Sequence, residues 1–308
     1  MASSTVSPRH RRPAQSPVRR RPARSRQAFP FSGLVGVALL AVAGIASVTV
    51  AVADAVRDPQ VQLAPPAADI PPVAAAAYMV VDGGTGRPLA SFNADQPRPV
   101  ASLTKLMTAR LVLDAGDLDH TVTVPRLQMA GDESQAGLRP GDHVSRAGLL
   151  EAMLVASAGD AARALAVDVA GDERSFVRMM NTEAAAAGLD ATRYANPDGL
   201  DDPAQHSSAA DVAHLARDLM QGATFRGIVA AGSTRLNGSE LRTTNDLLGA
   251  YRGADGIKTG HTDEAGWCIA ASAIRDGRRI VVVVLGAPTE AARDAAATAL
   301  LDYGFSVV

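Results

Sequence analysis

The two lysines of the chain are the first candidates for catalytic chemistry. The chain has 30 basic residues, of which only Lys105 and Lys258 are lysine. Arginine keeps its proton inside a protein, whereas a desolvated lysine can become neutral and act as a base. Lys105 follows Ser102 by three residues, one helical turn, so its amine can reach the serine hydroxyl. The pair predicts a serine nucleophile with a lysine base, which is chemistry suited to acyl transfer.

The second lysine opens the segment Lys258-Thr259-Gly260. A cation beside a hydroxyl can hold a substrate carboxylate, and the glycine is expected to leave room for a peptide against a strand. We place this segment just before the strand predicted at Gly266–Ala273, or in its leading edge. Ser-x-x-Lys alone is a weak signal, since a helix cap followed by a solvated charge gives the same pattern. Because both lysines fall in such segments, the two together favour one catalytic site.

Apolar patterning predicts strands at both ends of the folded part and helices between them. Strands are predicted at Ala77–Asp82, around Leu89 and Phe92 after a glycine turn, at Gly266–Ala273 and at Ile280–Leu285. Helical regions are predicted at Ala101–Leu113 with Ser102 as its cap, and at Leu149–Val169, Phe176–Ala187 and Thr289–Tyr303. This order predicts an α+β domain with an antiparallel sheet.

The N-terminal part has the pattern of a membrane anchor. Residues 33–53 are uncharged and, as a helix, about long enough to cross a bilayer. Eight arginines precede them, which predicts a cytoplasmic tail at 1–32 and an extracytoplasmic remainder. A proline-rich linker at 54–75 and a catalytic domain at 76–308 then follow. The expected location is the bacterial cell membrane, as a single-pass protein; the alternative is secretion after signal cleavage near Ala53.

Charge and cysteine content exclude several classes of function. The part after residue 53 has 22 basic and 32 acidic residues, which argues against nucleic acid as a partner. Cys268 is the single cysteine, so no internal disulfide can form, and its position favours packing over reactivity. The histidines lack the spacing of metal ligands, and neither a metal nor a cofactor is predicted. Asp198, Asp201 and Asp202 are typical of a turn cluster.

Longer motifs around these residues resemble one family. The matching segments are Pro99–Thr108, Gly137–Asp142, Leu149–Ser157, Asn196–Leu200, Asp255–Thr262 and Leu301–Phe305. They resemble the D-alanyl-D-alanine carboxypeptidases of the low-molecular-mass penicillin-binding proteins, serine peptidase family S11. The resemblance covers roughly Ala76 to Val308 and implies a β-lactamase/transpeptidase-like fold, with an antiparallel sheet flanked by helices and a helical subdomain.

The resemblance implies a role for each site residue. Ser102 would attack the penultimate D-alanine of a peptidoglycan stem peptide ending in D-Ala-D-Ala, with Lys105 as general base and Ser157 relaying the proton to the leaving amine. Lys258 and Thr259 would bind the terminal carboxylate beside Gly260, and the backbone N–H groups of Ser102 and His261 would form the oxyanion hole. The His261 side chain is expected to be a surface imidazole, and the sequence shows no partner for it. β-Lactam antibiotics would acylate the same serine.

One departure from the family pattern bears on turnover. The third motif of the family is Ser-x-Asn, and here Ser157-Ala158-Gly159 has glycine in place of asparagine. A missing contact of this sort costs about 1 to 3 kcal/mol, and whether water or Asp160 substitutes for it stays open at this point. The alternatives are therefore a weakly active or inactive protein that binds penicillin and stem peptides, and, less favoured, a serine β-lactamase. The glutamate before Leu-Asn that a β-lactamase uses to activate water is missing from the sequence.

Overall fold

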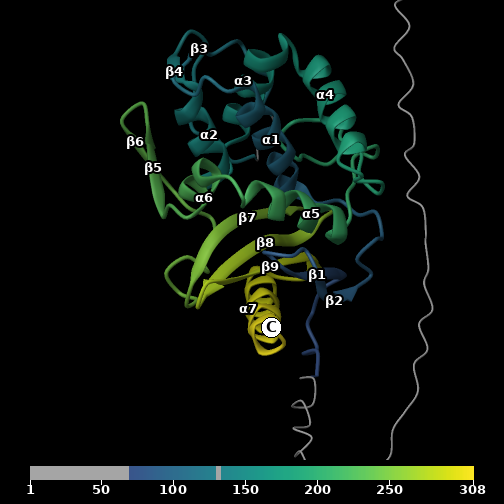
Figure 1. Ribbon diagram of the computed structural model, residues 1–308. Helices are drawn as coiled ribbons and strands as arrows, with labels where there is room; N and C mark the ends of the chain where they lie inside the picture. The colour runs from purple at the N-terminus through teal and green to yellow at the C-terminus, as the bar shows by residue number, and fades with distance from the viewer. Residues whose placement is uncertain (1–68, 130–132) are drawn as a thin grey trace, which may run out of the picture. The chain divides into compact units, whose positions relative to one another are not determined.

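A computed structural model describes residues 69–129 and 133–308 and has a five-stranded antiparallel sheet at its centre (Figure 1). The strands are β1 (Ala77–Asp82), β2 (Pro88–Phe92), β3 (Thr121–Thr123), β4 (His143–Ser145), β5 (Ser233–Leu236), β6 (Ser239–Arg242), β7 (Ala254–Thr262), β8 (Gly266–Arg275) and β9 (Arg278–Ala287). The order in the sheet is β2-β1-β9-β8-β7, and β3 with β4 and β5 with β6 form two separate two-stranded sheets. Strands from both ends of the domain therefore share one sheet, as the sequence predicts.

The helices lie mostly between these two groups of strands along the chain. They are the 3-10 helix η1 (Ala101–Thr104), α1 (Lys105–Ala115), α2 (Arg146–Val155), α3 (Gly159–Ala170), α4 (Glu173–Ala186), α5 (Ala209–Leu219), α6 (Ala223–Val229) and α7 (Glu290–Ser306). Figure 1 shows α7 on one face of the sheet, with α5 and the cluster of α1–α4 toward the other. The α+β prediction is confirmed, and the flanking helices have the predicted arrangement.

Strand β9 shows why the sheet is buried on both faces. Its residues Val281, Val283 and Leu285 pack into the core shared with the helical cluster. The alternating residues Ile280, Val282 and Val284 pack into a second core, which α7 completes. Side chains of a strand point to alternate faces, so a continuous apolar run fits a strand covered on both sides.

Two predicted elements differ from the structure. The helical region predicted at Leu149–Val169 is two helices, because Ser157 adopts a left-handed conformation with φ 62° between α2 and α3. The segment Lys258-Thr259-Gly260 lies just before the strand that begins at Gly266, as one of the two predicted placements has it, but it is itself part of a strand, β7, that the sequence did not predict. This strand pairs with β8 along its length, with Lys258 opposite Ala270.

The predicted membrane helix at 33–53 and most of the linker at 54–75 lie outside the described residues. Within the part of the chain that the structure describes, none of the helices combines the length and apolarity that a membrane crossing requires.

Candidate active site

Ser102 and Lys105 meet where η1 passes into α1. The Lys105 Nζ donates a hydrogen bond to the Ser102 Oγ over 2.9 Å. Ser102 lies in the middle of η1 and Lys105 is the first residue of α1, so the predicted helix begins with a tight 3-10 turn. The Ser102 hydroxyl makes no capping bond there, which corrects the prediction that it caps the helix. The hydroxyl is instead turned toward the lysine amine.

A loop that follows α4 holds the other side of the lysine. The Lys105 Nζ also donates to the Asp198 carbonyl, and the Thr108 Oγ1 donates to the Pro197 carbonyl over 2.6 Å. The Asp198 carboxylate is buried and accepts a hydrogen bond from the Arg163 Nε over 2.6 Å. Asp198 lies in a turn, as predicted, with its carboxylate accepting the Leu200 N–H over 3.3 Å, and in addition it joins α1 to α3.

Burial changes the acid-base properties of Lys105. The amine is enclosed, and desolvation lowers the pKa of Lys105 to about 8, although the carboxylates of Asp198 and Glu133 act in the opposite direction. Burial disfavours the charged form of a lysine, and nearby anions favour it. A lysine with this pKa exchanges its proton near neutral pH, which suits a general base.

Strand β7 holds the second lysine next to Thr259. The Lys258 side chain is buried, and its Nζ donates to the Thr259 carbonyl over 2.8 Å. Burial, followed by the charges of Lys105 and Arg293, lowers the pKa of Lys258 well below its usual range. The hydroxyls of Thr259 and Thr244 lie 2.6 Å apart. A bound carboxylate would supply the negative charge that this cluster of cations lacks.

Gly260 brings β7 against the start of η1. A Cβ at Gly260 would lie 2.9 Å from the Ser102 nitrogen and 3.0 Å from the Ala101 Cβ. The glycine therefore makes room for the backbone at the nucleophile, a contact that the sequence does not predict, and it also lines the cavity. Because His261 follows directly in β7, this contact places the backbone of Ser102 beside the strand segment that carries His261.

Gly199 allows a second close approach at the same point. Its φ is +91°, and a Cβ there would lie 2.1 Å from the Ala101 carbonyl oxygen. Only a residue without a side chain fits such a contact in this conformation.

The turn between α2 and α3 adds Ser157 and Gly159. Ser157 lines the cavity, and Gly159 is the first residue of α3. The Asp160 carboxylate accepts the backbone N–H groups of Ala136 and Leu138 over 2.8 and 3.0 Å. Asp160 thus binds the segment after residue 133, so it is not the group that replaces the missing asparagine.

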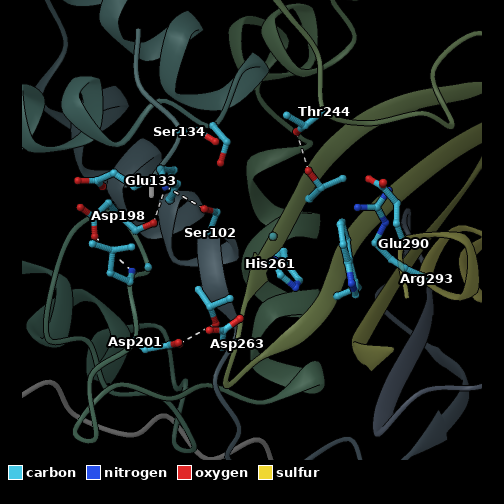
Figure 2. Close-up of a pocket in the computed structure, with 18 residues that line it drawn as sticks. Ser102, Glu133, Ser134, Asp198, Asp201, Thr244, His261, Asp263, Glu290 and Arg293 are labelled. Atoms are coloured by element: carbon cyan, nitrogen blue, oxygen red, sulfur yellow. Dashed lines mark hydrogen bonds and ion pairs between the residues drawn. The ribbon is translucent and has the colours of Figure 1, made fainter. Parts of the chain in front are cut away.

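These elements enclose a cavity of about 580 Å³ (Figure 2). Of the predicted site residues, the cavity lining includes Ser102, Lys105, Ser157, Thr259, Gly260 and His261. Lys258 lies behind this wall, buried next to Thr259. The His261 imidazole is exposed, as predicted, and it packs on the Trp267 ring with 4.2 Å between centroids, a partner that the sequence does not reveal.

The cavity also contains residues that the sequence did not indicate. Figure 2 shows Glu133, Ser134 and Asp198 on one side of Ser102, and Thr244, Glu290 and Arg293 on the other. The Arg293 guanidinium is almost fully buried and lies 5.5 Å from the centre of the Trp267 ring. Glu133 lies outside the matched segments, four residues before Gly137–Asp142, and Arg293 is one position of the helix predicted at Thr289–Tyr303. Within residues 69–129 and 133–308, no group of three or more His, Cys, Asp or Glu side chains is arranged to hold a metal ion.

Comparison with known proteins assigns this site to a family. The family model described as D-alanyl-D-alanine carboxypeptidase, peptidase family S11, matches residues 64–289. The chain belongs to this family. It is 39% identical over 247 residues to the D-alanyl-D-alanine carboxypeptidase DacD of Escherichia coli, with 76% of this chain and 64% of the relative covered.

Two solved structures share the fold. Penicillin binding protein 6B from Escherichia coli superposes with a TM-score of 0.75 at 37% identity, over 78% of this chain and 80% of that chain. The Streptomyces K15 DD-transpeptidase superposes with a TM-score of 0.74 at 33% identity, over 78% of this chain and 100% of that chain. The chain spans about three fifths of the length of several curated relatives that it matches. The α+β fold of the described residues is thus that of DD-peptidases and penicillin-binding proteins.

Proposed function

We propose that the chain is a serine-type D-Ala-D-Ala carboxypeptidase that removes the terminal D-alanine from peptidoglycan stem peptides through an acyl-enzyme. The observation that carries this proposal is the 2.9 Å hydrogen bond between the Lys105 amine and the Ser102 hydroxyl, in a cavity whose facing wall is β7. Membership of the S11 family supports the same reaction. The relatives are named as carboxypeptidases, which favours an enzyme over a silent binding protein.

In the acylation step, neutral Lys105 takes the Ser102 proton while the Oγ bonds to the carbonyl carbon of the penultimate D-alanine. The bond from that carbon to the terminal D-alanine nitrogen then breaks, and the leaving amine receives a proton through Ser157, which lines the same cavity. Water later hydrolyses the ester. The close contact of β7 with Ser102 supports the backbone N–H groups of Ser102 and His261 as the oxyanion hole.

The terminal carboxylate of the substrate is assigned to the Lys258 and Thr259 wall. The buried cations around Lys258 lower one another's affinity for protons. A carboxylate that binds beside them brings negative charge and so stabilises their protonated forms. β-Lactams carry an acyl group and a carboxylate of similar arrangement, so they are expected to acylate Ser102 as well. One structural neighbour, penicillin binding protein 6B, is named for binding a member of this ligand class.

The assay for this function is D-alanine release from a stem-peptide mimic ending in D-Ala-D-Ala. The wild-type chain is expected to release one D-alanine per peptide, and Ser102→Ala to release none. Release by Ser102→Ala at the wild-type rate would refute the assignment of the nucleophile. Release from a mimic ending in L-Ala at an equal rate would refute the substrate class.

For the N-terminal part, we propose a single-pass anchor at 33–53 that places the catalytic domain outside the cytoplasm of a bacterium. The support is the uncharged run of 21 residues after eight arginines. Fractionation of cells that express the full chain tests it, with a variant that starts at residue 54 as the comparison. The full chain is expected in the membrane fraction at its full mass, and a shortened mass with release into the medium would show signal cleavage instead.

A further inference from the structure

Gly159 leaves a space that a carboxylate fills. A Cβ built on Gly159 would lie 2.3 Å from the Glu133 Oε2 and 3.1 Å from the Glu133 Cδ. These distances mean that any side chain at position 159 would displace the Glu133 carboxylate. Glu133 lines the cavity that contains Ser102 and Lys105 (Figure 2), and Gly159 follows Ser157, another lining residue, by two positions.

The start of α3 holds the segment that carries Glu133. The backbone N–H of Gly159 donates to the Ser134 carbonyl over 2.7 Å. The Asp160 carboxylate accepts the N–H groups of Ala136 and Leu138. Gly159 and Asp160, two adjacent residues of α3, thus take part in three hydrogen bonds that fix the backbone next to Glu133. The same helix end supplies the space for the carboxylate and the anchors for its chain segment.

Glu133 lines the same cavity as Lys105, and its negative charge raises the pKa of the Lys105 amine. The charged groups that face this amine are Asp198 and Glu133 from loops, Asp160 and Arg163 from α3, and Lys258 from β7. Asp198 is the anion that most favours the charged form of Lys105, and Glu133 is the second. Arg163 interacts with both of these carboxylates, since its Nε donates to Asp198 over 2.6 Å and the charge of Glu133 also favours its protonated form.

We propose that Glu133, in the space left open by Gly159, is the positioning residue for Lys105 during proton transfer from Ser102. When Lys105 takes the serine proton it becomes an ammonium, and a carboxylate beside it stabilises that ammonium and holds it near the oxygen. The assignment deepens the proposed acyl-enzyme function and depends on it. It also accounts for glycine at position 159, because a side chain there and a carboxylate from residue 133 exclude each other.

The first test replaces Glu133 by glutamine, which keeps the shape and removes the charge. The second-order rate constant for acylation by a labelled penicillin is measured from pH 5.5 to 9.5. Glu133→Gln is expected to lower the plateau rate by about 10- to 100-fold, the usual scale for losing a charged partner of a buried ammonium. The rate constant is expected to rise with pH as Lys105 loses its proton, and this rise is the acidic limb of the pH profile. Glu133→Gln is expected to move the acidic limb to lower pH, because an anion that favours protonated Lys105 is gone.

The control for charge removal is Glu240→Gln in the exposed β6 strand, outside the cavity. It is expected to leave both the plateau and the limb unchanged. A purely structural role for Glu133 would lower the rate without moving the limb, and that result would overturn the proposal. An unchanged plateau in Glu133→Gln would overturn it as well.

The second test places a methyl group in the space. Gly159→Ala fits the helical backbone, and the atom that it meets is the end of a flexible side chain, so the fold is expected to survive. The matched control is Gly227→Ala in α6, where nothing lies within 4 Å of the added Cβ. Gly159→Ala is expected to shift the limb and lower the plateau as Glu133→Gln does, whereas Gly227→Ala changes neither.

The double variant Glu133→Gln with Gly159→Ala decides whether the two residues act together. Residues in contact give non-additive effects, so the double variant is expected to be about as slow as the slower single variant. Independent effects that multiply would contradict the proposal. The proposed function fails separately, through a wild-type chain that is not acylated at all.

Discussion

The pH dependence of acylation follows from the burial of Lys105. Only the neutral amine can accept the Ser102 proton, and burial lowers the pKa of Lys105 to about 8. From that value, about one tenth of the amine is neutral at pH 7 and about one hundredth at pH 6. The acylation rate constant is therefore expected to rise about tenfold per pH unit up to pH 8 and then to level off.

The experiment follows acylation by a labelled penicillin in stopped flow across this range. Lys105→Arg is the companion variant, because arginine keeps its proton at every pH tested. It is expected to lose about 10² to 10⁴ of the rate, the usual contribution of a positioned base. Thermal unfolding of the same variant checks that the fold is retained.

Lys258 can be distinguished from Lys105 by the sign of its effect. Lys105 must lose a proton to react, so its titration makes the acylation rate constant rise with pH. Lys258 attracts a carboxylate best when protonated, so its titration makes the rate constant fall with pH. A rate that is flat from pH 6 to 9, or a Lys105→Arg variant that keeps the wild-type rate, would refute the assignment of Lys105 as the base.

Three further outcomes are expected. Arg293 lines the cavity, and its charge acts on Lys258, so we expect its guanidinium to attract the ligand carboxylate as well. Arg293→Leu is then expected to slow acylation by penicillin about 10- to 100-fold, as when a charged partner is lost; a wild-type rate would show that Arg293 does not meet the carboxylate. Gly199→Ala places a Cβ 2.1 Å from the Ala101 carbonyl oxygen at a φ of +91°, so chemical denaturation is expected to show a loss of about 1 to 3 kcal/mol; an unchanged stability would contradict the close contact. Binding of a carboxylate ligand to the Ser102→Ala variant is expected to raise the pKa of Lys258, so that protons are taken up on binding. Calorimetry in buffers of different ionisation enthalpy detects this uptake as a binding heat that depends on the buffer. A binding heat that is the same in every buffer would argue against proton uptake by Lys258.

The part of the site that depends on short sequence spacing could be predicted. Ser102 and Lys105 are one turn apart, and local helix geometry brings their side chains together whatever the rest of the chain does. The strands β8 and β9 were also predictable, because their apolar runs flank a tight turn. Such features need no knowledge of distant contacts.

The parts that depend on tertiary contacts could not be predicted. Strand β7 is rich in glycine and polar residues, and it becomes a strand by pairing with β8. Glu133 reaches the cavity because α3, more than twenty residues later, anchors its segment. The break between α2 and α3 depends on a left-handed Ser157, for which alanine-rich flanks give no signal.

The most direct test of the central claim is the site of covalent modification by penicillin. The wild-type chain is incubated with penicillin, and its intact mass and proteolytic peptides are measured beside those of Ser102→Ala. One penicilloyl group is expected per chain, located on Ser102, with none on the variant. An adduct on another residue, or an equal adduct on Ser102→Ala, would contradict the assignment of Ser102 as the nucleophile.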